Sequence, residues 1–214
     1  NHDGYVSYLP TLMDFPLQIA FNESLTDGFR YGMGFRKPYR SLASDFLYPD
    51  PNNLLVFPDN HDMARFFTQV NKDIDLFKMG IVFYSTIRGI PQFYYGTEIL
   101  MSPDEKRPGN HGLVRTEFPG GWPDHIKNAF TGENLTDDEL EIQSFFKELL
   151  NWRKNNNVIH DGKLIQFAPK DEVYSYFRIL DDKMVWVILN RNNSSKTLKT
   201  ERFAELISEK KIRL

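Results

Sequence analysis

The chain has 214 residues, a net charge of −3, a sequence pI near 6.0 and no cysteine. Its Lys and Arg residues are scattered, so we expect no nucleic-acid partner, and the missing cysteines exclude disulfides and thiolate metal sites. No uninterrupted run of 18 apolar residues occurs, so no membrane span is expected, and the 41% hydrophobic content suffices for a substantial core.

The first two thirds of the chain alternate short apolar runs with helical patterns. Residues 74–88 have the apolar spacing of a helix, whereas residues 26–36 hold three glycines and are expected to form a loop. Buried strands are expected where apolar residues run without interruption, at residues 12–15, 54–57 and 90–95.

The pattern changes in the last third. A polar stretch at 102–134 is longer than a compact domain needs, which favours a functional loop. Thr136 and Glu139 form a capping-box pattern that predicts a helix from about residue 138 to 154. Period-two runs predict antiparallel strands at 163–168, 173–179 and 183–190, and residues 203–214 are a candidate for one more strand.

Three βα units followed by a β module predict a chain with a boundary near residue 158. Because a (β/α)₈ barrel needs eight such units, this pattern indicates part of a larger fold. The segment with the most chemistry is Asn60-His61-Asp62, which directly follows a predicted buried strand. In parallel α/β folds the carboxyl end of a strand is where ligands bind.

Two other interpretations of this segment use the same residues. Asp62 could cap a helix that begins at Met63, with His61 on the surface. A metal pair formed by His61 and Asp62 would need further ligands at set spacings. The remaining candidates show no such pattern, so we set the metal pair aside; these are His111, His125 and His160.

Five segments, in chain order, resemble the α-amylase family of glycoside hydrolases, in its cyclomaltodextrinase and neopullulanase branch. Asn60-His61-Asp62 resembles the His-Asp motif after the seventh barrel strand. The other segments resemble the sixth strand with its helix (13–17), the eighth strand with its Tyr-Tyr-Gly (89–99), a loop of this branch (115–122) and the eighth helix (149–153). Residues 158–190 are similar to the C-terminal β-sandwich domain.

The resemblance implies a fold and a division of the chain. Residues 1–157 would form about strands six to eight of a (β/α)₈ barrel, and residues 158–214 a C-terminal β-sandwich domain. Asp62 matches the third catalytic carboxylate, which engages sugar hydroxyls and helps distort the ring, and His61 matches a histidine that hydrogen-bonds the same sugar.

Three more residues complete the candidate substrate-binding set with His61, and each has a plainer alternative. Arg115 matches an arginine that reaches a sugar in relatives, or it forms a loop salt bridge. Trp122 is either a sugar-stacking platform or a loop anchor under Pro119 and Pro123. Asn60 is included as part of the matched motif.

Neighbouring residues are expected to support the site rather than touch substrate. Asp14 is expected to be a buried carboxylate that must find hydrogen bonds, and Glu98 to orient its neighbours. Arg65 is expected either to pair with a carboxylate of the site or to lie on a solvated helical face. Tyr94 and Tyr95 are expected to belong to a strand core.

The family's nucleophile and general acid are not matched in this chain. Residues 28–32 and 34–38 resemble the Gly-x-Arg-x-Asp nucleophile motif, but they carry Gly32 and Pro38 where aspartate must stand. The resemblance therefore implies that these two carboxylates, with strands one to five, lie upstream, and that this chain alone is inactive.

The predicted function is that of a retaining glycoside hydrolase that cleaves α-glucosidic bonds in cyclodextrins, pullulan or maltooligosaccharides. The alternatives are a non-catalytic α-amylase-like carbohydrate-binding or accessory protein, and a self-standing carbohydrate-binding module. Expected partners are an α-glucan oligosaccharide, the upstream part of the same protein and a second copy in a homo-oligomer. No cofactor or metal site is expected here, although the resemblance allows calcium in the complete enzyme. The compartment is not assigned.

Overall fold

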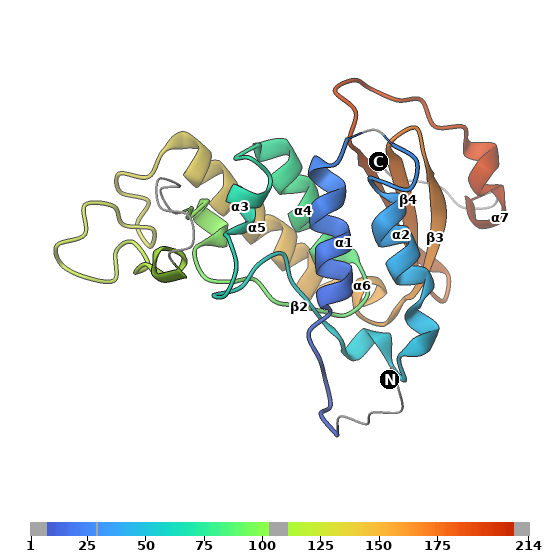
Figure 1. Ribbon diagram of the computed structural model, residues 1–214, viewed down its shortest axis with the longest axis horizontal. Coiled ribbons are helices and arrows are strands. Elements are labelled where there is room, and N and C mark those ends of the chain that lie inside the picture. The colour runs from blue at the N-terminus through green and yellow to red at the C-terminus, as the bar shows by residue number, and fades with distance from the viewer. Residues whose placement is uncertain (1–7, 29, 103–110, 208–214) are drawn as a thin grey trace.

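The computed structural model describes residues 8–28, 30–102 and 111–207. Figure 1 shows α1 (Phe15–Thr26) near the middle of the molecule, with α4 (Ile74–Thr86) and α5 (Asp137–Lys154) on one side of it. On the other side lie α2 (Arg36–Ala43) and an antiparallel sheet. The remaining helices are short: η2 (Asp45–Leu47), η3 (Pro51–Asn53), α3 (Phe66–Gln69), η4 (Thr97–Ile99), η5 (His111–Arg115) and α6 (Asn157–Asp161).

Three short parallel segments lie side by side in chain order. β1 (Leu55–Val56) pairs in parallel with β2 (Ile90–Pro91), and Met13 forms a parallel bridge to Leu55 on the other side. Helices α1 and α2 connect the first segment to the second, and α3 and α4 connect the second to the third. The predicted alternation of strands and helices is therefore present in this part of the chain.

All three strands expected in this part of the chain are shorter than predicted, and β1 covers only Leu55–Val56 of the strand expected at 54–57. The strand at 12–15 is wrong beyond the Met13 bridge, because Asp14 caps α1 through a 3.1 Å bond from the Leu17 N–H and the helix starts at Phe15. The strand at 90–95 ends at Pro91. Among the described residues β2 has a strand neighbour on one side only, so no second ladder extends it.

The longer helices begin and end where local signals place them. Thr136 and Glu139 form the predicted capping box, with bonds of 3.2 and 2.8 Å between each side chain and the other residue's N–H. Asp73 caps α4 through the Leu76 N–H. Gly89, just after α4, has φ +101°, and a Cβ there would lie 2.6 Å from the Leu54 carbonyl oxygen, so glycine is required.

The predicted C-terminal hairpins are confirmed: β3 (Lys163–Lys170), β4 (Val173–Leu180) and β5 (Lys183–Asn190) form an antiparallel sheet in that order. Among the described residues this is a single sheet, not the expected two-sheet sandwich. The extra strand expected at 203–214 is wrong for its described part, because η6 (Thr200–Phe203) and α7 (Ala204–Ile207) are helical and pack Phe203 and Ile207 against Phe177. The rest of that prediction lies outside the described residues.

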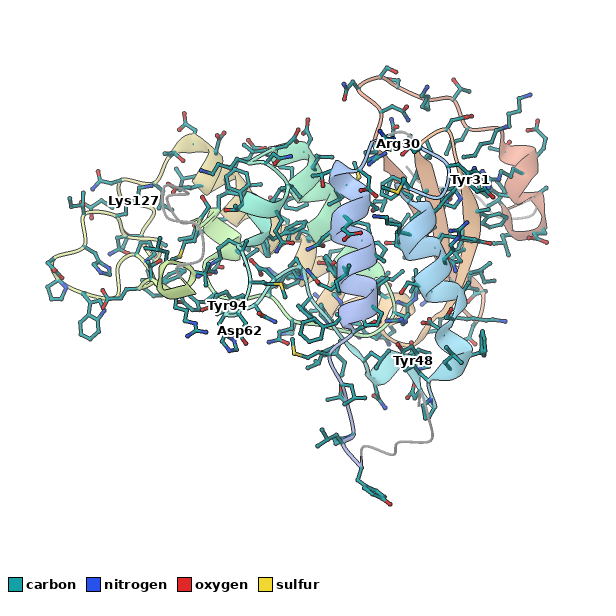
Figure 2. The ribbon with its side chains drawn as sticks, viewed as in Figure 1. Arg30, Tyr31, Tyr48, Asp62, Tyr94 and Lys127 are labelled. Atoms are coloured by element: carbon teal, nitrogen blue, oxygen red, sulfur yellow. The ribbon has the colours of Figure 1, made fainter. Side chains whose placement is uncertain are left out.

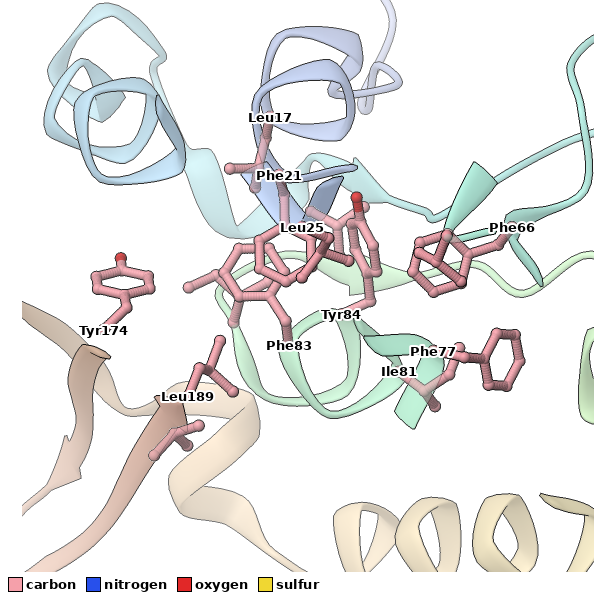
Figure 3. Close-up of a cluster of buried hydrophobic side chains, with 14 of the residues drawn as sticks. Leu17, Phe21, Leu25, Phe66, Phe77, Ile81, Phe83, Tyr84, Tyr174 and Leu189 are labelled. Atoms are coloured by element: carbon pink, nitrogen blue, oxygen red, sulfur yellow. The ribbon is translucent and has the colours of Figure 1, made fainter. Parts of the chain in front are cut away.

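One aromatic-rich core joins the helices to the sheet (Figure 3). Phe21 of α1 stacks on Phe83 of α4 with ring centroids 3.7 Å apart, and Tyr84 meets Phe21 edge-on. Tyr174 and Leu189 of the sheet belong to the same buried cluster. Burying each such side chain stabilises the fold by about 1.5–3 kcal/mol. In the described part of the chain, no helix has the length and apolar character needed to cross a membrane.

Candidate functional site

The candidate site lies at the carboxyl ends of β1 and β2. After β1 the chain runs through the buried Asp59 and Asn60 and then turns outward. The Asn60 Oδ1 accepts the Asp62 N–H at 2.8 Å, which fixes this turn. The turn exposes the side chains of His61 and Asp62, which are 59% and 64% exposed.

The interpretation of Asp62 as a helix cap is wrong. α3 begins at Phe66, and the side chain that caps it is that of Asp59, whose Oδ2 accepts the Phe66 N–H at 2.7 Å. Asp62 has no such role, so its carboxylate is available for other partners.

Both oxygens of the Asp62 carboxylate face a cationic or titratable group. The Arg115 Nη2 donates to Asp62 Oδ1 at 2.7 Å, and its Nε donates to the His61 carbonyl at 2.9 Å. The His61 Nε2 lies 3.3 Å from Asp62 Oδ2. Three of the candidate residues thus meet at one point, and the salt-bridge interpretation of Arg115 is confirmed with Asp62 as its partner.

Tyr94 and Tyr95, which follow β2, contact the residues around Asp62 and the loop that carries Arg115. The His61 and Tyr94 rings lie 6.4 Å apart, and Figure 2 labels Asp62 and Tyr94 next to each other. The Tyr95 hydroxyl donates to the Thr116 carbonyl at 2.6 Å, which ties the loop that carries Arg115 to the end of β2. The expectation of a strand core is wrong for both tyrosines, because β2 ends at Pro91 and Tyr95 is 39% exposed.

Arg65 follows neither of its predicted roles. Its side chain is buried, its guanidinium lies 4.1 and 5.0 Å from the ring centroids of Tyr94 and Tyr95, and it donates to the Tyr95 carbonyl. No salt bridge joins it to Asp62 within the described residues. Its stacking on the tyrosines links the segment after β1 to the segment after β2.

Burial changes the acid–base behaviour of two groups near the site. It raises the pKa of Asp59 to about 6, against the opposing effects of the Phe66 N–H, the Arg65 charge and the Thr97 hydroxyl. Burial also raises the pKa of Tyr94, with a further contribution from the neighbouring Tyr95 hydroxyl. A carboxylate with a pKa of about 6 changes its charge close to neutral pH.

The supporting residues Asp14 and Glu98 lie away from Asp62. Asp14 finds the hydrogen bonds that its burial requires, from the Leu17 N–H and from Arg88 at 2.7 Å. Arg88 also binds Asp45 with two bonds of 2.8 and 2.6 Å. Glu98 lies on η4 and lines a hollow of about 400 Å³ with Phe93, Tyr95, Gln143, Phe146, Lys147 and Leu150.

Within the described residues, no hydrogen bond, ion pair or ring contact joins the Trp122 side chain to the other candidate site residues. It is 58% exposed, so the expectation of an anchor packed beneath Pro119 and Pro123 is wrong. The loop of residues 116–134 extends away from the helices (Figure 1). Among the described residues no group of three or more His, Asp or Glu side chains could hold a metal ion.

Several polar residues behind the site were not predicted. Asp59 is not among the predicted site residues, although it immediately precedes the Asn-His-Asp run. Gln18 and Asn22 stand four residues apart on α1, beside the buried Leu17, Phe21 and Leu25, and both amides are buried. Such a polar pair on a buried helical face is a signal in the sequence, because buried amides need hydrogen-bond partners.

Comparisons with known proteins identify relatives of this chain. Residues 164–212 match the cyclo-malto-dextrinase C-terminal domain family. A cyclomaltodextrin glucanotransferase of Thermoanaerobacterium thermosulfurigenes is 28% identical over 86% of the chain and 23% of its own length. A cyclomaltodextrinase of Thermoanaerobacter pseudethanolicus is 28% identical over 87% of the chain and 29% of its own length. The chain therefore spans about a quarter of these relatives.

Solved structures show the same relationship. The γ-CGTase of alkalophilic Bacillus clarkii has a TM-score of 0.60 at 28% identity, over 85% of this chain and 24% of its own. An α-amylase of Geobacillus thermoleovorans, at 23% identity and a TM-score of 0.64, covers 86% of this chain with 37% of its own and shows a shared fold. The chain is thus a relative of cyclomaltodextrinases and cyclomaltodextrin glucanotransferases, its residues 164–212 match the cyclo-malto-dextrinase C-terminal domain family, and α-amylase-family enzymes are its structural neighbours.

Proposed function

We propose that the chain is the C-terminal part of a retaining glycoside hydrolase that cleaves α-glucosidic bonds in cyclodextrins, pullulan or maltooligosaccharides. The observation that carries this proposal is the carboxylate of Asp62, held between Arg115 and His61 at the carboxyl ends of two parallel strands. The names of the relatives, a cyclomaltodextrinase and cyclomaltodextrin glucanotransferases, support the substrate class.

In this proposal Met13, β1 and β2 belong to strands six, seven and eight of a (β/α)₈ barrel, with residues 1–157 in the barrel and 158–214 in the C-terminal domain. The parallel pairing in chain order supports it. Apolar side chains on the Met13 side also remain uncovered: Leu12, Phe15 and Ile19 are 44%, 42% and 51% exposed. An uncovered apolar strip of this kind fits packing against the upstream part of the same protein.

The proposed roles rest on the resemblance to the α-amylase family, and the geometry around Asp62 supports some of them. Asp62 binds hydroxyls of the sugar at the cleavage point, and this binding becomes stronger in the transition state, when positive charge develops on the ring. His61 binds the same sugar, Arg115 holds the Asp62 carboxylate in place, and Asn60 fixes the turn. Trp122 stacks on a more distant sugar. The nucleophile and the general acid come from the upstream part, and any calcium ion belongs to the complete enzyme.

The test is Asp62→Asn in the complete enzyme, with cyclomaltodextrin and maltooligosaccharides as substrates. The swap preserves size but removes the charge, so we expect kcat to fall by about 10²–10⁴ while the melting temperature stays nearly constant. His61→Ala should cost less and act partly on KM. Asp182→Asn, at the exposed turn between β4 and β5, is the matched control and should leave kcat unchanged.

Two results would contradict the proposal. One is an Asp62→Asn enzyme that keeps most of its rate, because Asp62 would then lie outside the reacting centre. The other is glycosidase activity in the purified 214-residue chain, because Asp62 alone supplies neither nucleophile nor proton donor. Binding of maltooligosaccharides by the complete protein without any hydrolysis would support the non-catalytic alternative.

A further inference from the structure

Amide side chains of α1 form hydrogen bonds to the start of the segment that carries Asn60, His61 and Asp62. The Asn22 Nδ2 donates to the Pro58 carbonyl at 2.7 Å, and the Gln18 Nε2 donates to the same carbonyl at 3.2 Å. Both amides are buried, 6% and 5% exposed. One carbonyl near the start of the segment is therefore fixed by two donors from a neighbouring helix.

The orientation of the Asn22 amide is itself determined by its other partners. The Tyr84 hydroxyl of α4 donates to Asn22 Oδ1 at 2.7 Å, and the Asn22 Nδ2 also donates to Gln69 Oε1 at 2.8 Å. Both amide hydrogens and the amide oxygen of Asn22 are thus used. A flipped amide would set its oxygen against the Pro58 carbonyl and the Gln69 Oε1, which are both acceptors, so the observed orientation is the one that satisfies the group.

Gln69 carries the connection to the other end of the segment. Its Nε2 donates to the Ala64 carbonyl at 2.6 Å. Tyr84, Asn22 and Gln69 therefore link the carbonyls of Pro58 and Ala64 in one hydrogen-bonded chain, and His61 and Asp62 lie between these two points. Asp59 adds a third fixed point inside the segment through the Phe66 N–H.

Packing alone does not explain amides at these positions. The same face of α1 buries Leu17, Phe21 and Leu25 completely or nearly so, and an apolar residue at 22 would avoid burying an amide. Buried polar networks that satisfy every member impose one arrangement on the groups they join. What this network joins is the segment with the candidate catalytic carboxylate.

We propose that Asn22, oriented by Tyr84 and extended by Gln69, is a positioning residue that fixes segment 58–64 and through it the orientation of His61 and Asp62. This inference rests on the proposed glycosidase function. A catalytic group displaced by about 1 Å can cost on the order of a hundredfold in rate while substrate still binds, so loosening the network lowers kcat more than it changes KM.

The experiment uses Tyr84→Phe and its matched control Tyr176→Phe in the complete enzyme. Both tyrosines are buried in the same core and both lose one hydroxyl contact, but the Tyr176 hydroxyl binds Thr86 at 2.6 Å, not Asn22. Tyr84→Phe should lower kcat on cyclomaltodextrin about tenfold with KM within about twofold. Tyr176→Phe should lower the melting temperature by a similar amount with kcat unchanged.

A second readout is independent of activity. Hydrogen–deuterium exchange of amides 59–66 should be about tenfold faster in Tyr84→Phe and unchanged in Tyr176→Phe. Gln69→Met changes a partly exposed residue of the same network and should have the same effects on kcat and exchange. It replaces Tyr84→Phe in the experiment if that variant does not fold.

Unchanged exchange at 59–66, or equal kcat in the two tyrosine variants of an active enzyme, would overturn the positioning role. Faster exchange in a complete protein that hydrolyses no α-glucan would instead contradict the proposed function and leave the network confirmed.

Discussion

Arg115 binds two consecutive residues at once: its Nη2 lies 2.7 Å from Asp62 Oδ1 and its Nε lies 2.9 Å from the His61 carbonyl oxygen. The planar guanidinium fork makes this double contact possible. Because the Arg115 and Asp62 side chains are 47% and 64% exposed, solvent screens the ion pair, and its main effect is on geometry and not on stability.

Arg115→Lys should therefore separate activity from stability. A lysine keeps the charge but cannot reach both acceptors with one rigid fork, so we expect kcat/KM of the complete enzyme to fall about tenfold or more. The melting temperature should change by no more than about 2 °C. Arg202→Lys is the control, since exposed Arg202 donates to the Ala168 carbonyl near the C-terminal sheet. Equal kinetics in the two variants would contradict the role of Arg115.

Asp59→Asn should change how stability depends on pH. Burial raises the folded-state pKa of Asp59 to about 6, above its ordinary value of 3.8, so folding favours the protonated form. Ionised Asp59 therefore destabilises the fold above pH 6, and this cost disappears as the pH falls towards 4. Asparagine keeps the size and can still accept the Phe66 N–H, but it does not titrate.

The measurement is urea unfolding of both proteins between pH 4 and 8. The stability of Asp59→Asn relative to the original protein should be greater at pH 8 than at pH 4, by on the order of 2–3 kcal/mol. Asp73→Asn, a cap at the exposed start of α4, is the control for the loss of a capping carboxylate in the same unfolding series. A difference that is constant with pH would mean that Asp59 titrates normally.

The sequence predicted best those features that depend on residues close together in the chain. The capping box of α5, the helix at 74–86 and the hairpins of β3 to β5 all follow from local periodicity and caps. The lengths of the strands at 12–15 and 90–95 were not predictable in the same way, because a strand extends only as far as its partner does.

The candidate site was predictable in part for the same reason. The Asn-His-Asp run is contiguous, so its position after β1 followed from the pattern. The partner of Asp62 is 53 residues away and the partner of Arg88 is 74 residues away, and no local signal joins such pairs. The burial of Asp59 and its bond to the Phe66 N–H were not predicted, because they depend on the packing of α3 and η4 around this residue.

Arg88→Met should be among the most destabilising single changes in this chain. The Arg88 and Asp14 side chains are 3% and 1% exposed, and Arg88 also pairs with Asp45. Removing the guanidinium leaves the buried Asp14 carboxylate without its cation, which costs about 3–5 kcal/mol. Combining it with Asp14→Asn should recover part of this loss, because the uncompensated charge is then gone.

Arg178→Met provides the comparison in the same unfolding measurements. Arg178 is equally buried, but its partners are the Gly162 and Thr86 carbonyls, and burial lowers its pKa to about 10. Its loss leaves acceptors unpaired and no isolated charge, so it should cost about 1–3 kcal/mol. A loss as large as that of Arg88→Met would show that carboxylate isolation is not the dominant cost.

Trp122→Ala tests whether the extended loop takes part in substrate binding. Trp122 is 58% exposed on the loop of residues 116–134, so its removal should leave the melting temperature almost unchanged. If the indole stacks on a sugar away from the cleavage point, KM for maltooligosaccharides should rise by roughly 3–10-fold with little change in kcat, because that contact is shared by the ground and transition states. Shorter substrates that do not reach the loop should show a smaller effect.

Trp152→Ala on α5 is the matched control, since that side chain is 41% exposed and should affect neither KM nor kcat. An unchanged KM for every substrate length in Trp122→Ala would remove Trp122 from the binding site and leave it as an exposed residue of the loop.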